Sequence, residues 1–248
     1  MYKNDEAHAR EVLSITEDNI DKTITEIREA STHVKEPLFN RKFYKPLLLA
    51  FLLATFNQLS GINAIIYFAP RVFNLAGIDE SAAFLSTTGI GVVNLMFTII
   101  GWSLIDKFGR RTLMFIGSIG YIVSLSLISY SFYSHHTSFI VYYVFMFIAA
   151  HAIGQGAVIW VFISEIFPNS VRASGTSFGC LTHWFWAALV TQVFPFFAGS
   201  GNPMDVGTRI FGFFACMMVL QLIYVWRMMP ETKGIALEDM DKATVVLH

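Results

Sequence analysis

A short polar run interrupts the first long apolar stretch of the chain. It extends from Asn57 and Gln58 to Asn63, and Tyr67 follows one helical turn later. Amide side chains both donate and accept hydrogen bonds, and their burial is costly unless they find partners. Such a cluster predicts either a polar ligand bound in a cavity or hydrogen bonds between the helices of a static bundle.

The spacing of these residues suggests a broken helix. On a regular helix, Asn57, Gln58 and Gly61 share one face, whereas Asn63 and Tyr67 share another. A straight helix could not aim all of them at one ligand. A break near Gly61 could, and discontinuous helices form binding sites in many membrane proteins.

The composition identifies the environment of this run. Of the 248 residues, 54% are hydrophobic and 14% are charged, against about 25% charged in soluble domains. No Asp, Glu, Lys or Arg occurs in the 53 residues from Thr112 to Ser164. Such stretches exceed the roughly 20 apolar residues that cross a bilayer, so soluble enzymes are excluded. The net charge of −1 offers no basic patch for nucleic acid.

Six membrane spans are predicted, joined by short loops, which is typical of an all-α antiparallel helical bundle. The expected spans are Pro46 to Phe73, Ala82 to Ile105, Thr112 to Tyr133, Phe139 to Ile163, Ser174 to Phe197 and Arg209 to Met229.

The distribution of basic residues orients the spans. An even number of spans places both termini on one side, and 15 of the 17 Lys and Arg residues lie on that side. Only Arg71 and Arg209 lie on the other. The positive-inside rule therefore predicts that both termini are cytoplasmic.

Three segments are expected along the chain. Residues 1–45 are polar with apolar residues at helical spacing, which predicts two short amphipathic helices on the cytoplasmic face, the second capped near Thr16 or Asn19. Residues 46–229 form the six-helix transmembrane bundle, and residues 230–248 form a polar cytoplasmic tail.

Charged residues gather at the cytoplasmic ends of the spans. Their simple interpretation is a set of positive-inside turns, with Gly109 ending one helix. A sharper interpretation is a cytoplasmic latch in which acids and guanidinium groups pair across helix ends in one conformation. The residues of this expected latch are Asp106, Arg110, Arg111, Glu165, Arg172 and Glu231.

The order of these motifs resembles one family. From about residue 5 onward, the chain resembles the C-terminal half of a sugar porter of the major facilitator superfamily. The segments that carry the resemblance are Gln58-x-x-Gly61-Ile62-Asn63 with Tyr67 and Pro70, Asp106 to Arg111, Ser164 to Pro168 with Arg172, and Pro230 to Gly234.

The resemblance implies a sugar site and assigns its residues. Amides would hydrogen-bond sugar hydroxyls, while indole faces would cover the apolar side of the ring. The implied ligands are Asn57, Gln58, Asn63, Tyr67, Asn94, Trp160, His183 and Trp184. Without the resemblance, Trp160 and Trp184 would be interpreted as packing residues.

Three positions depart from the family pattern. Asn57 stands where a second Gln is common, and His183 stands where an amide is common. Ala157 replaces a proline before Trp160, which puts the bend of that helix in doubt, although Gly154 and Gly156 could supply flexibility.

The resemblance also implies a partner and an activity. Sugar porters have twelve spans with the substrate site between two six-helix halves, so an N-terminal six-helix half is expected as a partner of this bundle. The expected function is alternating-access transport of a monosaccharide or related polyol, by sugar:proton symport or uniport, in the plasma membrane. The alternative is a truncated or non-transporting sugar-binding or regulatory membrane protein. Neither metal-ligand spacing nor a catalytic constellation occurs in the spans, so no enzyme activity and no cofactor are expected.

Overall fold

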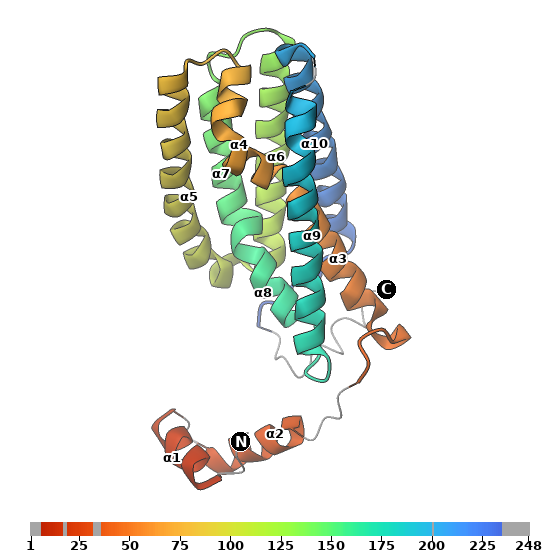
Figure 1. The fold of residues 1–248 in the computed structure, drawn as a ribbon. Helices are drawn as coiled ribbons and strands as arrows, with labels where there is room; N and C mark the ends of the chain where they lie inside the picture. The colour runs from red at the N-terminus through yellow and green to blue at the C-terminus, as the bar shows by residue number, and fades with distance from the viewer. Residues whose placement is uncertain (1–5, 17–18, 32–35, 200, 235–248) are drawn as a thin grey trace.

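The structure, a computed structural model, describes residues 6–16, 19–31, 36–199 and 201–234. Within these ranges every regular element is helical (Figure 1). Most of the expected C-terminal tail, from residue 235 onward, lies outside the described residues. Residues 1–5, where the resemblance begins, also lie outside them.

Two short helices precede the bundle. They are α1 (Glu6–Thr16) and α2 (Ile20–Ser31), followed by a turn of 3-10 helix at Arg41–Phe43. The Asn19 side chain accepts a hydrogen bond from the backbone N–H of Lys22 at 3.2 Å, which caps α2 as predicted.

Six helical stretches are long and apolar enough to cross a membrane, as the sequence predicted. They are α3 (Tyr44–Leu59) with α4 (Ile62–Leu75), α5 (Glu80–Phe108), α6 (Arg110–Tyr133), α7 (Ile140–His151) with α8 (Ala157–Glu165), α9 (Arg172–Ala198) and α10 (Pro203–Arg227).

The predicted bounds of the last span need a correction. Its helix begins at Pro203, six residues before the expected start at Arg209, and ends at Arg227. The Asn202 side chain accepts a hydrogen bond from the backbone N–H of Met204 at 2.9 Å. Proline suits the first turn of a helix, where its missing N–H costs nothing, so the cap and Pro203 together start α10 early.

The first span is broken at Gly61, as the spacing of its polar residues suggested. Gly61 has φ of +82°, a conformation that glycine adopts without strain. A side chain at this position would collide with the ring of Phe214 on α10. Ser60 and Gly61 separate α3 from α4, so residues on the two halves of the span can face different directions.

A second irregularity interrupts the fourth span. A π-helical turn covers Ala152–Gly156 between α7 and α8. Here Gly154 packs so closely on Gly117 of α6 that an added Cβ would lie 2.8 Å from the Gly117 Cα. The turn supplies a local change of helical geometry without the proline that Ala157 replaces.

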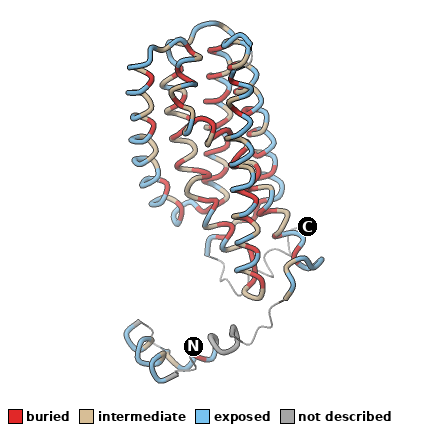
Figure 2. The backbone as a smooth tube through the Cα atoms, viewed as in Figure 1, coloured by how far each residue is buried: buried red, intermediate tan, exposed pale blue. Residues whose placement is uncertain are grey.

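The helices bury their apolar side chains in two clusters. One includes Phe73, Phe132 and Phe147, and the other includes Phe43 and Phe162 near the ends that carry the charged motifs. Buried residues follow the inward faces of the bundle, whereas α5 is largely exposed along its length (Figure 2).

Candidate sugar site and a charge cluster at the helix ends

The side chains of Gln58 and His183 meet at the end of α3. Gln58 Nε2 lies 3.1 Å from His183 Nε2 on α9, and it also donates a hydrogen bond to Asn57 Oδ1 at 3.0 Å. All three side chains are buried. Helix α3 packs along α9, which brings together residues that are 125 positions apart in the sequence.

Two indoles flank the His183 ring. The ring centroid of Trp160 on α8 lies 4.7 Å from that of His183, and the Trp184 centroid lies 5.3 Å away. Both indoles are more than 40% exposed, so they present open faces beside the buried amides. We refer to Asn57, Gln58, Trp160, His183 and Trp184 as the amide–aromatic cluster.

One polar atom of this cluster has no partner. Gln58 Oε1 is buried and accepts no hydrogen bond from the described residues. A buried acceptor without a donor costs roughly 1–3 kcal/mol. The site can therefore accept a hydrogen bond from a hydroxyl and place an apolar ring face against an indole.

The remaining sequence-predicted sugar ligands lie on other helices. Asn63 and Tyr67 are one turn apart on α4, beyond the break, and Asn94 is on α5. Asn63 and Asn94 are half-buried, and Tyr67 is exposed. Among the described residues, no hydrogen bond joins these three side chains to the amide–aromatic cluster.

Four of the predicted latch residues, Asp106, Arg110, Glu165 and Glu231, form a compact group at the opposite ends of the helices from the α9–α10 loop. Arg110 donates two hydrogen bonds to Glu165, from Nε at 3.1 Å and from Nη2 at 2.8 Å, and a third to Asp106 at 3.0 Å. Arg110 is buried, Glu165 is half-buried and Asp106 is exposed. The paired geometry of guanidinium and carboxylate gives a strong, directional contact.

Glu231 caps the N-terminus of α6. Its carboxylate accepts hydrogen bonds from the backbone N–H groups of Arg110 at 2.9 Å and Arg111 at 3.0 Å. A negative charge is stabilised at a helix N-terminus, where backbone donors lack intrahelical partners. Gly109 permits this approach, because a side chain there would overlap the Glu231 carboxylate.

Further contacts close the group. The Thr232 hydroxyl donates to Glu165 at 2.7 Å, and Arg111 donates to the backbone carbonyl of Trp226 at 2.7 Å. Arg172 donates to the carbonyl of Phe167 at 3.1 Å. We call Asp106, Arg110, Glu165, Glu231 and Thr232 the charge cluster; it ties the ends of α5, α6 and α8 to the segment that follows α10.

Sequence reasoning missed three buried polar contacts. Gln221 on α10 donates to the hydroxyl of Ser118 at 2.7 Å and also contacts Gln155 in the π-helical turn. The hydroxyl of Tyr121 contacts the ring of His151. Glutamines inside charge-free apolar stretches were the available signal, because buried amides in a membrane need partners.

Comparison with known proteins places this arrangement among transporters. Residues 1–243 match the family described as "Sugar (and other) transporter". The chain is 38% identical over 209 residues to the arabinose-proton symporter of Bacillus subtilis, covering 83% of this chain and 44% of that protein. It is 34% identical over 200 residues to the D-xylose-proton symporter of Escherichia coli K12, covering 79% of this chain and 40% of that protein. The chain thus spans less than half the length of these two relatives.

Solved structures agree. The proton:xylose symporter XylE bound to 6-bromo-6-deoxy-D-glucose matches 97% of this chain and 52% of its own, with a TM-score of 0.82 and 27% identity. The inward open conformation of XylE from E. coli matches 96% of this chain and 49% of its own at 27% identity, with a TM-score of 0.70. The helices of this chain therefore follow the sugar-analogue complex more closely than the inward open structure.

Proposed function

Because this chain belongs to the sugar transporter family of the major facilitator superfamily, a family of multi-pass membrane transporters and not of enzymes, we propose that it is the C-terminal half of a transporter. The transported molecule is a monosaccharide or related polyol. Transport proceeds by alternating access, as sugar:proton symport or as uniport. The relatives named as proton symporters of pentoses support the choice of substrate class.

The observation that carries this proposal is the unpartnered buried oxygen of Gln58. Gln58 is fixed by Asn57 and His183, so its free acceptor is aimed before any ligand arrives. A sugar hydroxyl supplies the missing donor, and the exposed indole faces of Trp160 and Trp184 cover the apolar side of the ring. Asn63, Tyr67 and Asn94 complete the site from α4 and α5 on this proposal.

The second part of the proposal concerns gating. The charge cluster, with Arg111 and Arg172, acts as the cytoplasmic latch: it holds the ends of α5, α6, α8 and α10 together in one conformation and rearranges in the other. The weaker match to the inward open structure of XylE supports this assignment, because an intact cluster belongs to a state in which the cytoplasmic helix ends are gathered.

The site is completed by a partner on this proposal. An N-terminal six-helix half supplies the facing wall, because the substrate site of such transporters lies between two repeats near the bilayer midplane. The protein resides in the plasma membrane with both termini in the cytoplasm. The placement of 15 of 17 Lys and Arg residues on one side supports that orientation.

Uptake by reconstituted vesicles tests the proposal. The chain is reconstituted alone and with the N-terminal half of the Bacillus subtilis arabinose-proton symporter, and both preparations receive a panel of radiolabelled pentoses, hexoses and polyols. We expect uptake only with the partner half, and its loss in Gln58→Ala. The relative's own C-terminal half with the same partner is the matched control. Absence of uptake in the hybrid, with both halves folded and the control active, would contradict the proposal.

A further inference from the structure

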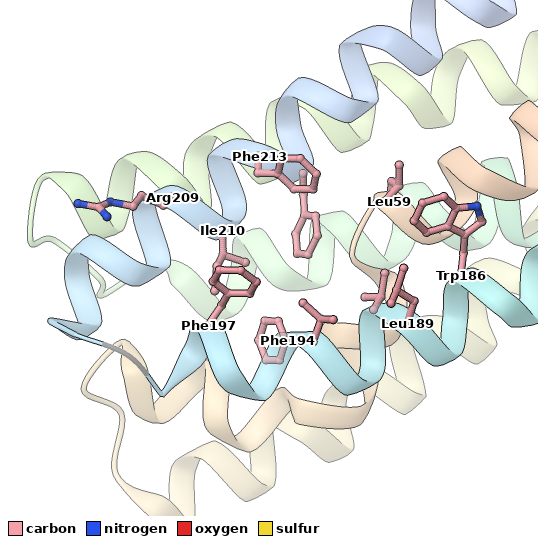
Figure 3. A pocket seen from close by; sticks show the side chains of 11 residues that line it. Leu59, Trp186, Leu189, Phe194, Phe197, Arg209, Ile210 and Phe213 are labelled. Carbon is pink, nitrogen blue, oxygen red and sulfur yellow. The ribbon is translucent and has the colours of Figure 1, made fainter.

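A cavity of about 530 Å³ lies between α9 and α10 (Figure 3). None of its lining residues belongs to the amide–aromatic cluster. Ten of the eleven residues around it are apolar. Several of them, including Val193 and Phe213, are exposed, so the cavity opens to the outside of the bundle between the two helices. The volume lies within the roughly 300–1,000 Å³ of pockets that enclose a small molecule.

The cavity has a polar mouth and an apolar inner end. Arg209, its one charged lining residue, lies at the end of the bundle where α9 finishes and α10 begins. Leu59 and Trp186 line the other end (Figure 3). From Trp186 to Phe197 the α9 wall extends eleven residues, or about 16 Å at the rise of an α-helix. This distance is close to half of the roughly 30 Å hydrocarbon thickness of a bilayer, the depth of one leaflet.

The cation at the mouth, Arg209, is exposed and available to a ligand. Arg71, the other cation expected on this side, donates a hydrogen bond to the carbonyl of Ala198 at 3.3 Å. The Arg209 guanidinium, in contrast, forms neither a hydrogen bond nor an ion pair with any residue that the structure describes. A cation at the headgroup level above an apolar slot one leaflet deep complements an acidic headgroup with its acyl chain below it.

We propose that this cavity binds one phospholipid, whose phosphate pairs with Arg209 and whose acyl chain extends along α9 to Leu59 and Trp186. The end of the acyl chain then lies beside the break of the first span, because Phe214, another lining residue, fills the space next to Gly61. Leu59 adjoins Gln58, so the lipid tail supports the wall behind the candidate sugar site. This proposal goes beyond sugar transport and does not depend on it.

Quenching of tryptophan fluorescence tests the proposal directly. The purified chain, stripped of lipid in detergent, is titrated with phosphatidylglycerol brominated along its acyl chains, and no sugar is present. Bromine quenches an indole only at contact, so we expect, above the quenching of the other exposed indoles, a saturable component that is lost in Trp186→Phe. Non-saturable quenching, or quenching unchanged in Trp186→Phe, would overturn the proposal.

Two pairs of variants separate the headgroup from the chain. Arg209→Gln is expected to weaken binding about fivefold, whereas Arg227→Gln, at the other end of the same helix, leaves it unchanged. Val193→Phe narrows the cavity and weakens binding, whereas Val219→Phe, exposed on α10 outside the cavity, does not. Equal affinities of Arg209→Gln and Arg227→Gln would overturn the headgroup contact. Equal affinities of Val193→Phe and Val219→Phe would overturn the acyl-chain contact. Displacement of the lipid by inorganic phosphate at equal concentration would instead show that Arg209 binds a free anion, and it would overturn the proposal of a bound lipid.

Discussion

The charge cluster and the amide–aromatic cluster are both polar groups packed between helices, but they differ in how completely they are satisfied. In the charge cluster, Arg110 reaches two acids while Glu231 accepts from the backbone of α6. In the amide–aromatic cluster, Gln58 uses its nitrogen twice and leaves its oxygen without a partner. The charge cluster is therefore satisfied by groups of the described chain, whereas the amide–aromatic cluster keeps a buried acceptor without a donor.

This difference separates two uses of buried polarity. A saturated network fixes helix ends, and removal of one member leaves another charge uncompensated. An unsaturated group costs stability in the empty protein, and a ligand that supplies the missing donor recovers that cost. Mutations in the charge cluster should therefore act on stability and on the proposed gating, and mutations in the amide–aromatic cluster mainly on sugar binding.

The largest effect is expected for Glu165→Gln. The variant removes the more buried of the two carboxylate charges that pair with Arg110, whose own side chain is only 11% exposed, and loss of one partner from a buried ion pair costs about 3 kcal/mol or more. Chemical denaturation of the purified chain in detergent, followed by far-UV circular dichroism, measures the loss in free energy of unfolding.

Asp106→Asn is the matched control for this variant. Asp106 pairs with the same guanidinium, but its side chain is 80% exposed, and exposed ion pairs contribute about 1 kcal/mol at most. Equal destabilisation by the two substitutions would contradict the distinction between the buried and the exposed partner of Arg110.

The next effect is expected for Gly109→Ala. Gly109 has φ of +86° and faces the Glu231 carboxylate, so alanine adds backbone strain and displaces the cap of α6, at a cost of about 2 kcal/mol. Gly77→Ala is the comparison, because Gly77 has φ of +81° with nothing within 4 Å of an added Cβ, so alanine there adds backbone strain without a collision. The same denaturation experiment should give about 1 kcal/mol for Gly77→Ala. A loss as large as that of Gly109→Ala would contradict the expectation that the glycine facing Glu231 is the more restricted of the two positions.

The sequence predicted the helices better than it predicted their contacts. Apolar length located six spans, and polar spacing located the break near Gly61, because both features are local. The contact of Gln221 with Ser118 was missed, since it joins residues 103 positions apart and depends on which helices are neighbours. Gly109 was interpreted only as a helix end, because its proximity to Glu231 arises from the return of the chain after α10.

Gln58→Ala tests the amide–aromatic cluster, where we expect the effect on sugar binding to exceed the effect on stability. We expect sugar affinity to fall about tenfold in the assembled transporter, because one to two hydrogen bonds to the ligand are lost. The free energy of unfolding should change by only about 1 kcal/mol, since removal of the unpartnered oxygen offsets the lost contact with His183. Equilibrium binding of labelled sugar and denaturation of the same variant measure both quantities.

Gln221→Ala is the matched control for that experiment. Gln221 is equally buried but contacts Ser118 and Gln155, outside the candidate sugar site. It should lower stability and leave sugar affinity unchanged. The opposite result, in which Gln221→Ala lowers sugar affinity and Gln58→Ala lowers only stability, would place the sugar site near Gln221 and not near Gln58.

The smallest effects are expected at His183. Substitutions there can separate the contact of its ring nitrogen with Gln58 from the packing of its ring between two indoles. His183→Gln retains a side chain able to hydrogen-bond Gln58 but loses the ring between Trp160 and Trp184, at a cost of about 1 kcal/mol of stability. His183→Phe retains the ring and loses the hydrogen bond, which releases Gln58 from its fixed orientation. We expect His183→Gln to keep sugar affinity within about threefold and His183→Phe to weaken it further, because a mobile Gln58 must be ordered when the sugar binds. Sugar affinity retained in His183→Phe would reduce His183 to a packing residue and remove the argument that Gln58 is oriented before the ligand arrives.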